Sequence, residues 1–376
     1  MRPALLRSTP MLSRRIPGRR TRTGKMTPAQ QAHAISVQGK FFFLGALLLL
    51  LIISAGFIIS LGQVPMTVQQ VYLTLVNRLI PGGFAVDSMI SHVVWHIRMP
   101  LITGTVMCGV GLGICGCVMQ AVLKNPMASP FTLGVSSGAH FGVSLAAVFG
   151  ITFLDGPYFL VGNAFICAAL CSGFIIALSA LRGASSETLI LAGIAVNYLF
   201  QAANQLLSYI ADDEQRTIMS YWGMGSLSDL NWHSLGFLGL ICLVCIPFLY
   251  RNAWDLNLMT TGDDCAKSMG VDANAVRMAV MVTASLLVAA IVAFTGVIGF
   301  VGLVAPHIAR IIIGNDHRFL IPASGGIGGA LLLIANAVSM NILGGVVIPV
   351  GIIMSMLGIP LFLYLIIRGK RREFWS

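Results

Sequence analysis

Apolar runs of about twenty residues recur along most of the chain, and they constrain its fold more than any other feature. A helix of that length crosses a hydrocarbon core about 30 Å thick while all its backbone polar groups are bonded internally. Of the 376 residues, 57% are hydrophobic and only 10% are charged, whereas soluble domains carry about 25% charged residues. The sequence therefore predicts an all-α polytopic membrane protein.

Ten segments are apolar enough to be predicted as transmembrane helices, and together they give a ten-helix domain over residues 41–368. An even number of crossings places both termini on the same side of the membrane. The predicted spans are 41–61, 100–122, 131–150, 158–181, 188–210, 234–250, 275–294, 297–313, 319–341 and 346–367.

The uneven distribution of basic residues predicts the orientation of these helices. Nine Lys and Arg residues and no acidic residue lie in 1–40, and the last segment, 369–376, is basic as well. With both termini in the cytoplasm, 20 of the 23 basic residues lie inside, and only Arg78, Arg98 and Arg216 lie outside. Because basic residues favour the cytoplasmic flanks of membrane helices, these clusters are not interpreted as a nucleic-acid surface.

Residues 1–40 are predicted to form a disordered, basic cytoplasmic tail, because the first 25 are rich in Arg, Ser, Thr and Pro. Two alternatives remain open for this stretch. A transit peptide has a similar composition, and translation from Met26 would remove most of the tail.

The longest polar interruption of the apolar region is the segment 251–277. Gly262 and Gly270 divide it, and Asp263 can cap a following helix, so one or two short surface helices are predicted. Its mixture of charged and apolar residues is typical of a solvated loop or of a docking surface for a soluble partner. The candidate docking residues are Leu256, Leu258, Met259, Asp263, Asp264, Lys267, Met269 and Val271.

Polar side chains interrupt the predicted span 188–210. Asn197, Gln201 and Gln205 follow one another at four-residue spacing and share one helix face. Polar groups in hydrocarbon are costly unless they are paired or hydrated. They therefore either bond to a neighbouring helix or line a polar pathway, and we favour the pathway.

Glycines disfavour a single helix through residues 275–313. Gly296, Gly299 and Gly302 precede Pro306, so a short loop followed by a half-span is expected. His307 lies in that half-span without a carboxylate nearby in sequence, which favours a structural, hydrogen-bonded role over a proton relay.

Motifs for nucleotide binding and metal catalysis are missing from the sequence. It contains no G-x-x-x-x-G-K-[ST] and no H-E-x-x-H, and Cys242 and Cys245 have C-x-x-C spacing without further ligands. We therefore expect no catalytic residue, no metal site and no cofactor in this chain. An ion-coupled transporter is an alternative, although only Glu187 and His307 could serve as its intramembrane titratable groups.

Six segments carry a resemblance that covers residues 40–370. They are RMP (98–100), QAVLKNPMASPFTLGVSSGA (120–139), LAGIAVN (191–197), YWGMGSLSDLNW (221–232), GVIGFVGLVAPHIARIIIGNDHR (296–318) and PVGIIMSMLGIPLFLYL (349–365). With these segments the chain resembles the FecCD family of ABC-transporter permeases, the vitamin B12 and ferric-siderophore type.

The resemblance implies a vitamin B12 permease-like fold in which two ten-helix subunits, as a homodimer, surround a central pathway. Two cytoplasmic ATPase subunits would drive the transporter, and an extracytoplasmic binding protein would deliver the substrate. The segment 251–277 matches the coupling helices that dock on the ATPases, and 188–210 matches the pore-lining helix. The cytoplasmic gate matches Asn125, Pro126, Met127, Ser185 and Ser186, and Arg98 matches an arginine that meets acids of the binding protein.

Departures from the family pattern fall on the docking positions for the binding protein. Leu101 replaces a second arginine, and Asn336, Met340 and Val347 align with a usual Asp, Arg and Glu. We expect a permease subunit of an ATP-driven importer in a prokaryotic cell membrane, with alternating access driven by partner ATPases. Its expected cargo is a ferric siderophore or similar large metal chelate, with a corrinoid or haem as the alternative.

Overall fold

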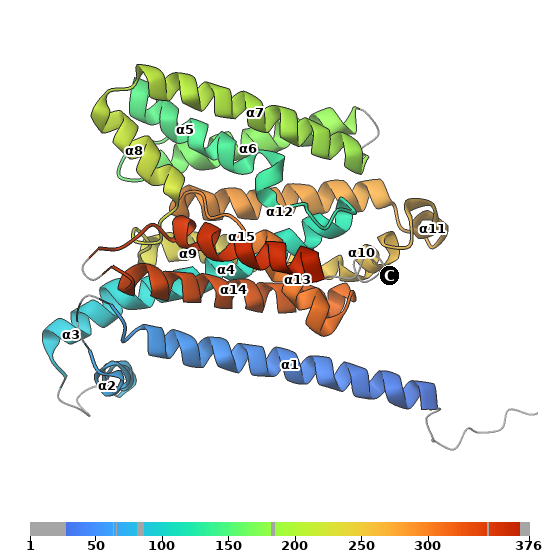
Figure 1. Ribbon diagram of the computed structural model, residues 1–376, viewed down its shortest axis with the longest axis horizontal. Helices are drawn as coiled ribbons and strands as arrows, with labels where there is room; N and C mark the ends of the chain where they lie inside the picture. Colours follow the sequence, from blue (N-terminus) through green and yellow to red (C-terminus); the bar gives the residue numbers. More distant parts are fainter. Residues whose placement is uncertain are drawn as a thin grey trace, which may run out of the picture. The chain divides into compact units, whose positions relative to one another are not determined.

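Helices are the regular elements of this protein. The computed structural model describes residues 28–62, 64, 66–80, 86–181, 185–343 and 346–368. In these residues the elements are α1 (Pro28–Ile58), α2 (Val68–Leu79), α3 (Ser88–His92), the π-helical η1 (Val93–Arg98), α4 (Met99–Val122), the 3-10 turn η2 (Pro130–Leu133), α5 (Val135–Phe149), α6 (Phe159–Ala180), α7 (Ser186–Ile210), α8 (Asp213–Met224), α9 (Trp232–Arg251), α10 (Ala253–Met259), α11 (Asp263–Ser268), α12 (Ala273–Thr295), α13 (Val301–Ile313), α14 (His317–Asn341) and α15 (Val350–Arg368) (Figure 1). The all-α prediction is confirmed.

Each predicted transmembrane span corresponds to a helix of the structure. Among the described residues, seven helices are long and apolar enough to cross a membrane, and the shorter apolar helices α5, α13 and α15 account for the other three predicted spans. Helices α3, η1 and α4 follow one another without a break, so the second apolar helix extends over Ser88–Val122.

Within the described residues, which start at Pro28, helix α1 covers Pro28–Ile58 and so includes residues well before the span predicted to start at residue 41. The prediction of a disordered tail is therefore wrong for residues 28–40, whereas 1–27 and 369–376 lie outside the described residues. Residues 1–40 and 41–376 form separate units, and all the helices after α1 belong to the second unit.

Helix α4 is the central element of this second unit. It packs on α14, α13, α12 and α9, and the helix is buried from Cys108 to Val122 except at Val110. A Cβ atom on Gly116 would lie 1.7 Å from the carbonyl oxygen of Gly302 in α13, and one on Gly113 would lie 2.3 Å from that of Ser324 in α14. The backbones of these helices therefore touch directly, because no side chain separates them.

Helices α5, α6, α7 and α8 pack against one another, and α6 also packs on α12. Asn163 of α6 is fully buried. Its amide donates to the carbonyl oxygens of Gly142 (3.2 Å) and Ile151 (2.7 Å), and its Oδ1 accepts from the N–H of Phe153 (2.8 Å). One amide thus fixes α5, α6 and the loop between them.

The chain breaks between α12 and α13, as the glycines predict. Gly296 and Phe300 have positive φ angles of 66° and 65°, so the backbone leaves the right-handed helix at both ends of this loop. Helix α13 has 13 residues, which gives a length of about 20 Å, shorter than the hydrocarbon core. The predicted half-span is confirmed.

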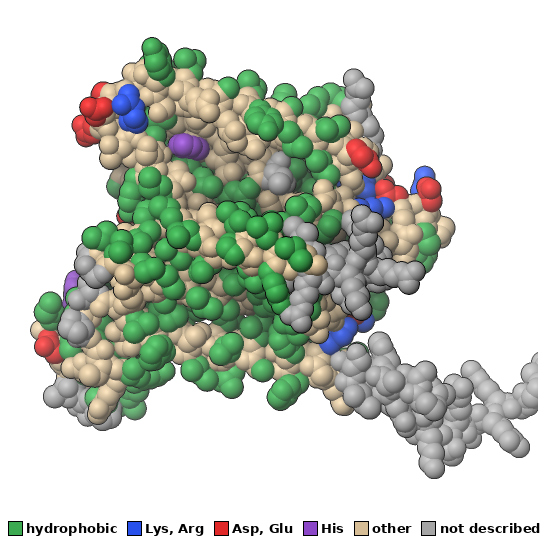
Figure 2. Space-filling model, viewed as in Figure 1, with side chains coloured by type: hydrophobic (Ala, Val, Ile, Leu, Met, Phe, Trp, Pro, Cys, Tyr) green, Lys and Arg blue, Asp and Glu red, His purple; other side chains and the backbone are tan. Residues whose placement is uncertain are grey.

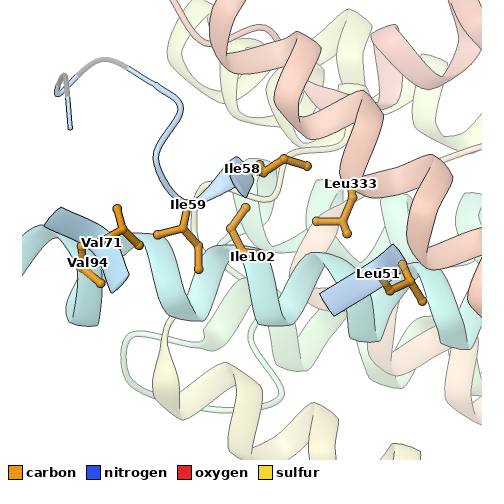
Figure 3. Close-up of a cluster of buried hydrophobic side chains, with 7 residues drawn as sticks. All are labelled: Leu51, Ile58, Ile59, Val71, Val94, Ile102 and Leu333. Atoms are coloured by element: carbon orange, nitrogen blue, oxygen red, sulfur yellow. The ribbon is translucent and has the colours of Figure 1, made fainter. Parts of the chain in front are cut away.

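A cluster of buried apolar side chains joins the end of α1 to the helices beside it. Figure 3 shows its members converging from α1, the residue that follows, α2, η1, α4 and α14. They are Leu51, Ile58, Ile59, Val71, Val94, Ile102 and Leu333.

Apolar side chains also cover the outside of the helices. On the face shown in Figure 2, hydrophobic side chains occupy the surface between the helix ends, and charged side chains gather near the ends. Leu243 is 73% exposed and Leu170 is 65% exposed. Such a surface is unfavourable in water but matches a lipid environment, where apolar residues face hydrocarbon and charges lie at the interfaces.

Candidate functional site

Two short helices, α10 and α11, interrupt the apolar region, as predicted. They lie at the end of the bundle where α4 ends and α12 begins (Figure 1). Gly262 and Gly270 have φ angles of 119° and 90° and separate α11 from its neighbours. Asp263 does not cap α11 as predicted, because Gly262 occupies the N-cap and the Asp263 carboxylate bonds elsewhere.

The predicted docking residues divide into buried and accessible ones. Leu256 and Met259 are fully buried, so their prediction as surface residues is wrong: they anchor α10 in its own chain, where it packs on α14 and α4. Met269 is 49% exposed. The accessible or half-buried members of the set are Leu258, Asp263, Asp264, Lys267, Met269 and Val271.

Polar contacts fix α10 to the start of α14. Asn257 accepts from the backbone N–H of His317 (2.9 Å) and donates to a carboxylate oxygen of Asp316 (2.9 Å). Arg318 pairs with the same carboxylate and stacks over Trp254, with 4.2 Å from its Cζ atom to the ring centroid. Burial alone would raise the pKa of Asp316, but the bonds from Arg318 and Asn257 lower it to about 2.

A single carboxylate fixes α11. Asp263 accepts from Lys124 Nζ at 2.8 Å, just beyond α4, and from Arg277 Nη2 at 2.9 Å, in the first turns of α12. The Arg277 side chain is only 1% exposed. Although burial of Asp263 opposes its ionisation, the hydrogen bonds from these two cations hold its pKa below the ordinary value.

The two predicted gate segments, Asn125–Met127 and Ser185–Ser186, lie beside each other. The Asn125 side chain accepts from the N–H of Met127 (2.9 Å), which shapes the turn after α4. Ser185 caps α7, and the Ser186 hydroxyl donates to the carbonyl oxygen of Val122, the last residue of α4 (3.2 Å). Met127 is 48% exposed. Pro126 lies between Asn125 and Met127 and restricts the backbone conformation of Asn125.

The polar residues of α7 point in different directions. Gln201 and Gln205 are exposed on the outside of this chain, and Asn197 is half-buried. Asn204, by contrast, is buried: its Oδ1 accepts from Ser144 Oγ (2.9 Å), and its Nδ2 donates to the carbonyl oxygen of Ser137 (3.3 Å). Asn204 therefore bonds to a neighbouring helix. For Gln201, Gln205 and Asn197, lining a polar pathway remains the prediction.

A pocket of about 500 Å³ opens beside α8, at the opposite end from α10 and α11 (Figure 1). Apolar atoms form most of its lining, and hydroxyl groups with one Arg–Asp ion pair offer hydrogen-bonding groups to a solute at this end of the chain. Its lining residues are Asp213, Arg216, Thr217, Ser220, Tyr221 and Met224.

Arg98, predicted to dock the binding protein, is buried at 5% exposure. Its guanidinium packs against Gly62, where a Cβ atom would lie 2.1 Å from Nη1, and Nη1 has no hydrogen-bond partner among the residues that the structure describes. Because Gly62 covers this group, the structure contradicts Arg98 as an exposed docking residue.

The contacts of Lys124 and Arg277 were not predicted from the sequence. The distribution of basic residues identified both only as cytoplasmic cations. The signal that could have found Lys124 is its position directly before Asn125, in a predicted gate segment. Nothing in the local sequence pairs it with Asp263, which lies 139 residues further along the chain.

A bundle of long apolar helices with an apolar outer surface and a charged two-helix segment at one end is the architecture of a polytopic membrane protein. Residues 46–368 match the model of the FecCD transport family. The chain belongs to the FecCD family of ABC-transporter permeases, whose ATPase is a separate subunit.

Relatives extend over nearly the whole chain. A Methanocaldococcus jannaschii protein named as an ABC transporter permease is 39% identical over 91% of this chain and 99% of its own length. The hemin transport system permease of Yersinia pestis is 37% identical over 88% of this chain and 96% of its own length. A solved structure described as a metal-chelate type ABC transporter in an inward-facing conformation superposes with a TM-score of 0.77 at 30% identity, over 87% of this chain and 99% of that one.

Proposed function

We propose that this chain is the permease subunit of an importer for large metal chelates, foremost a ferric siderophore. The observation that carries the proposal is the family match over residues 46–368. This match covers the first predicted span from residue 46 onward and the other nine spans completely. The metal-chelate type of the superposed transporter supports the cargo class. Haem is the second candidate, because a hemin permease is 37% identical, and a corrinoid is the third.

In this proposal two copies of the chain surround the pathway in a prokaryotic cell membrane, with both termini in the cytoplasm. Two ATPase subunits dock on the accessible side of α10 and α11, and an extracytoplasmic binding protein loads the substrate at the other end. The exposed Gln201 and Gln205, with Asn197, line the pathway. Amide side chains make weak, dispersed contacts, which let a large solute pass without being trapped.

ATP binding and hydrolysis in the partner subunits would alternate the access of the pathway. This requires the ATPases to contact the two permease conformations differently, because only differential binding shifts a conformational equilibrium. Leu258 and Met269 are the accessible apolar residues best placed for such contacts, since they lie on the surface of the α10–α11 segment.

The test is gentle purification of the chain from its own membrane, followed by mass spectrometry of the proteins that accompany it. We expect an ATPase with the unsubstituted chain and its loss from a Leu258→Asp, Met269→Asp variant. The control is Leu243→Asn on α9, an exposed residue of the lipid-facing surface. Absence of an ATPase from the unsubstituted chain would refute the proposal.

Uptake into membrane vesicles then separates the cargo candidates. The vesicles contain ATP on the cytoplasmic side of the membrane. A ferric siderophore, haem or cyanocobalamin is added on the other side. Uptake that vanadate abolishes and a protonophore leaves intact supports the importer. The opposite pattern would support the ion-coupled transporter.

A further inference from the structure

The ends of four helices meet at a set of charged side chains beside α11, of which Arg277 is buried and Lys124 and Asp263 are half-exposed. Asp263 bonds to Lys124 at 2.8 Å and to Arg277 at 2.9 Å. The Nε of Arg277 also donates to the carbonyl oxygen of Val122 at 3.0 Å, and its Nη1 donates to Asn274 at 2.8 Å. We name Asp263, Lys124, Arg277 and the Val122 carbonyl the Asp263 clamp.

The Val122 carbonyl extends the clamp to a fourth helix. It is the last residue of α4, and its oxygen also accepts from the hydroxyl of Ser186, the first residue of α7, at 3.2 Å. A continuous set of hydrogen bonds therefore runs from α11 through α12 and the end of α4 to the start of α7. Both predicted gate segments lie next to it.

Lys124 occupies a backbone conformation that does not suit it. Its φ is 48°, in the left-handed region, directly after the end of α4. Glycine is the usual residue at such a position, because a Cβ is disfavoured there. A strained non-glycine residue persists where its side chain is needed, and the ammonium of Lys124 makes a contact that glycine could not make.

Helix α11 packs on α10 and α12, and the ion pairs of Asp263 join it to Lys124, just beyond α4, and to Arg277 of α12. It has six residues, of which only Ala266 is buried. Charge-assisted hydrogen bonds are short and directional. Because the Arg277 side chain is almost completely buried, its guanidinium cannot move with α11 without also displacing the Val122 carbonyl to which it is bonded.

We propose that Asp263 is a positioning residue that transmits displacement of α11 to the gate segments, through Lys124 to residues 125–127 and through Arg277 and Val122 to Ser186. The inference rests on the proposed function, in which partner ATPases move α10 and α11. A purely structural clamp would only stabilise the fold. If Asp263 transmits displacement, a variant that weakens the clamp should reduce the response of the gate segments to the ATPases even when the fold is no less stable.

Lys124→Gly provides the decisive variant. It removes the cation but relieves the left-handed strain, so the folded chain should be no less stable. Asp263→Asn removes the charge while keeping the shape of the side chain. Lys124→Arg keeps the cation, and Asp255→Asn removes a half-buried carboxylate from the neighbouring helix α10, so these two serve as controls.

The readout is the gate itself. Met127, 48% exposed in the turn after α4, is replaced by cysteine in a Cys265→Ser background, because Cys265 is the exposed native cysteine among the described residues. The complex is purified with its ATPase and placed in liposomes. The rate of maleimide labelling at position 127 is then measured without nucleotide and with vanadate-trapped ATP.

We expect trapping to change the labelling rate in the parent complex and in both controls. In Lys124→Gly and Asp263→Asn the change should shrink at least about fivefold, the low end of a typical coupling between sites. The ATPase should still copurify with Lys124→Gly, because Lys124 lies outside the predicted docking set, and the thermal unfolding midpoint of this variant should match or exceed that of the parent.

Three results would overturn the inference. The first is an undiminished nucleotide response in Lys124→Gly or Asp263→Asn. The second is loss of the ATPase from Lys124→Gly, which would make the clamp part of the docking surface. The third is a parent complex that hydrolyses ATP without any response at position 127, which would exclude transmission to the gate while leaving the proposed function intact. Absence of an ATPase from the parent would instead refute the proposed function.

Discussion

Replacing Gly116 by alanine tests the direct backbone packing of α4 most sharply. The added Cβ would lie 1.7 Å from the carbonyl oxygen of Gly302 and 2.5 Å from its carbonyl carbon. A carbon and an oxygen in contact lie about 3.2 Å apart, so α4 and α13 would have to separate by about 1.5 Å. Backbone atoms cannot rotate away as a flexible side chain can.

The expected cost follows from this separation. A gap of 0.5–1 Å already forfeits roughly a quarter to a half of a dispersion contact, and overpacking typically costs about 1–3 kcal/mol. We expect at least about 3 kcal/mol for Gly116→Ala, since the clash exceeds ordinary overpacking. The matched control is Gly329→Ala in α14, whose Cβ would meet its nearest neighbour, Val110 Cγ2, at 3.4 Å.

The assay uses thiols that the fold already protects. Cys108, Cys115 and Cys117 of α4 are fully buried, so a dye that fluoresces on reacting with thiols reports when heating in detergent opens the helix packing. We expect Gly116→Ala to lower the midpoint by roughly 5 °C or more. Gly329→Ala should shift it little, or raise it, because alanine favours the helix by about 1 kcal/mol. Equal midpoints for the two variants would refute the packing argument.

Three further predictions concern polar groups. Asn204→Ala should lower the unfolding midpoint by the equivalent of about 1 kcal/mol, because it loses interhelical hydrogen bonds. Gln201→Ala, at an exposed residue, should reduce uptake without changing that midpoint. A lowered midpoint in Gln201→Ala together with reduced uptake alone in Asn204→Ala would contradict both roles. Asn163→Ala removes two hydrogen bonds to the loop after α5 and one to α5 itself, so limited proteolysis should cut residues 150–158 faster than in a Ser172→Ala control; equal cutting rates would contradict the anchoring. The pKa of Asp316 is depressed to about 2, so its stabilising contribution is present above about pH 4 and is lost as pH falls towards 2; Asp316→Asn should flatten this part of the acid-unfolding curve followed by tryptophan fluorescence, and an unchanged curve would contradict it.

Hydropathy and backbone chemistry predicted the elements of the fold because both act within a few consecutive residues. Runs of apolar residues gave the positions of the predicted spans, and the glycines at 296–302 indicated the break before α13. The same local signals predicted the α10–α11 segment, because Gly262 and Gly270 adopt the positive φ angles that end helices.

Local sequence could not predict which side of a short helix faces the protein. Leu256 and Met259 belong to the same mixed pattern as Leu258 and Met269, yet the first two are buried against other helices and the last two are accessible. A helix of seven residues, such as α10, is too short for its periodicity to define two faces.

Contacts between distant parts of the chain were equally out of reach. The ion pair of Lys124 and Asp263 joins residues 139 apart. The close approach of Gly116 in α4 to Gly302 in α13 likewise joins helices that lie far apart in the sequence. Tertiary structure decides such contacts.

The central position of α4 has a consequence for biosynthesis. Its backbone partners in α13 and α14 follow it by nearly 200 residues, so at 5–20 residues per second the ribosome needs on the order of ten seconds or more to supply them. During that time the glycine-lined grooves of α4 face lipid or a membrane chaperone. Chains that stop before residue 300 would keep these grooves open, which makes α4 a natural recognition element for the proteases that remove incomplete membrane proteins.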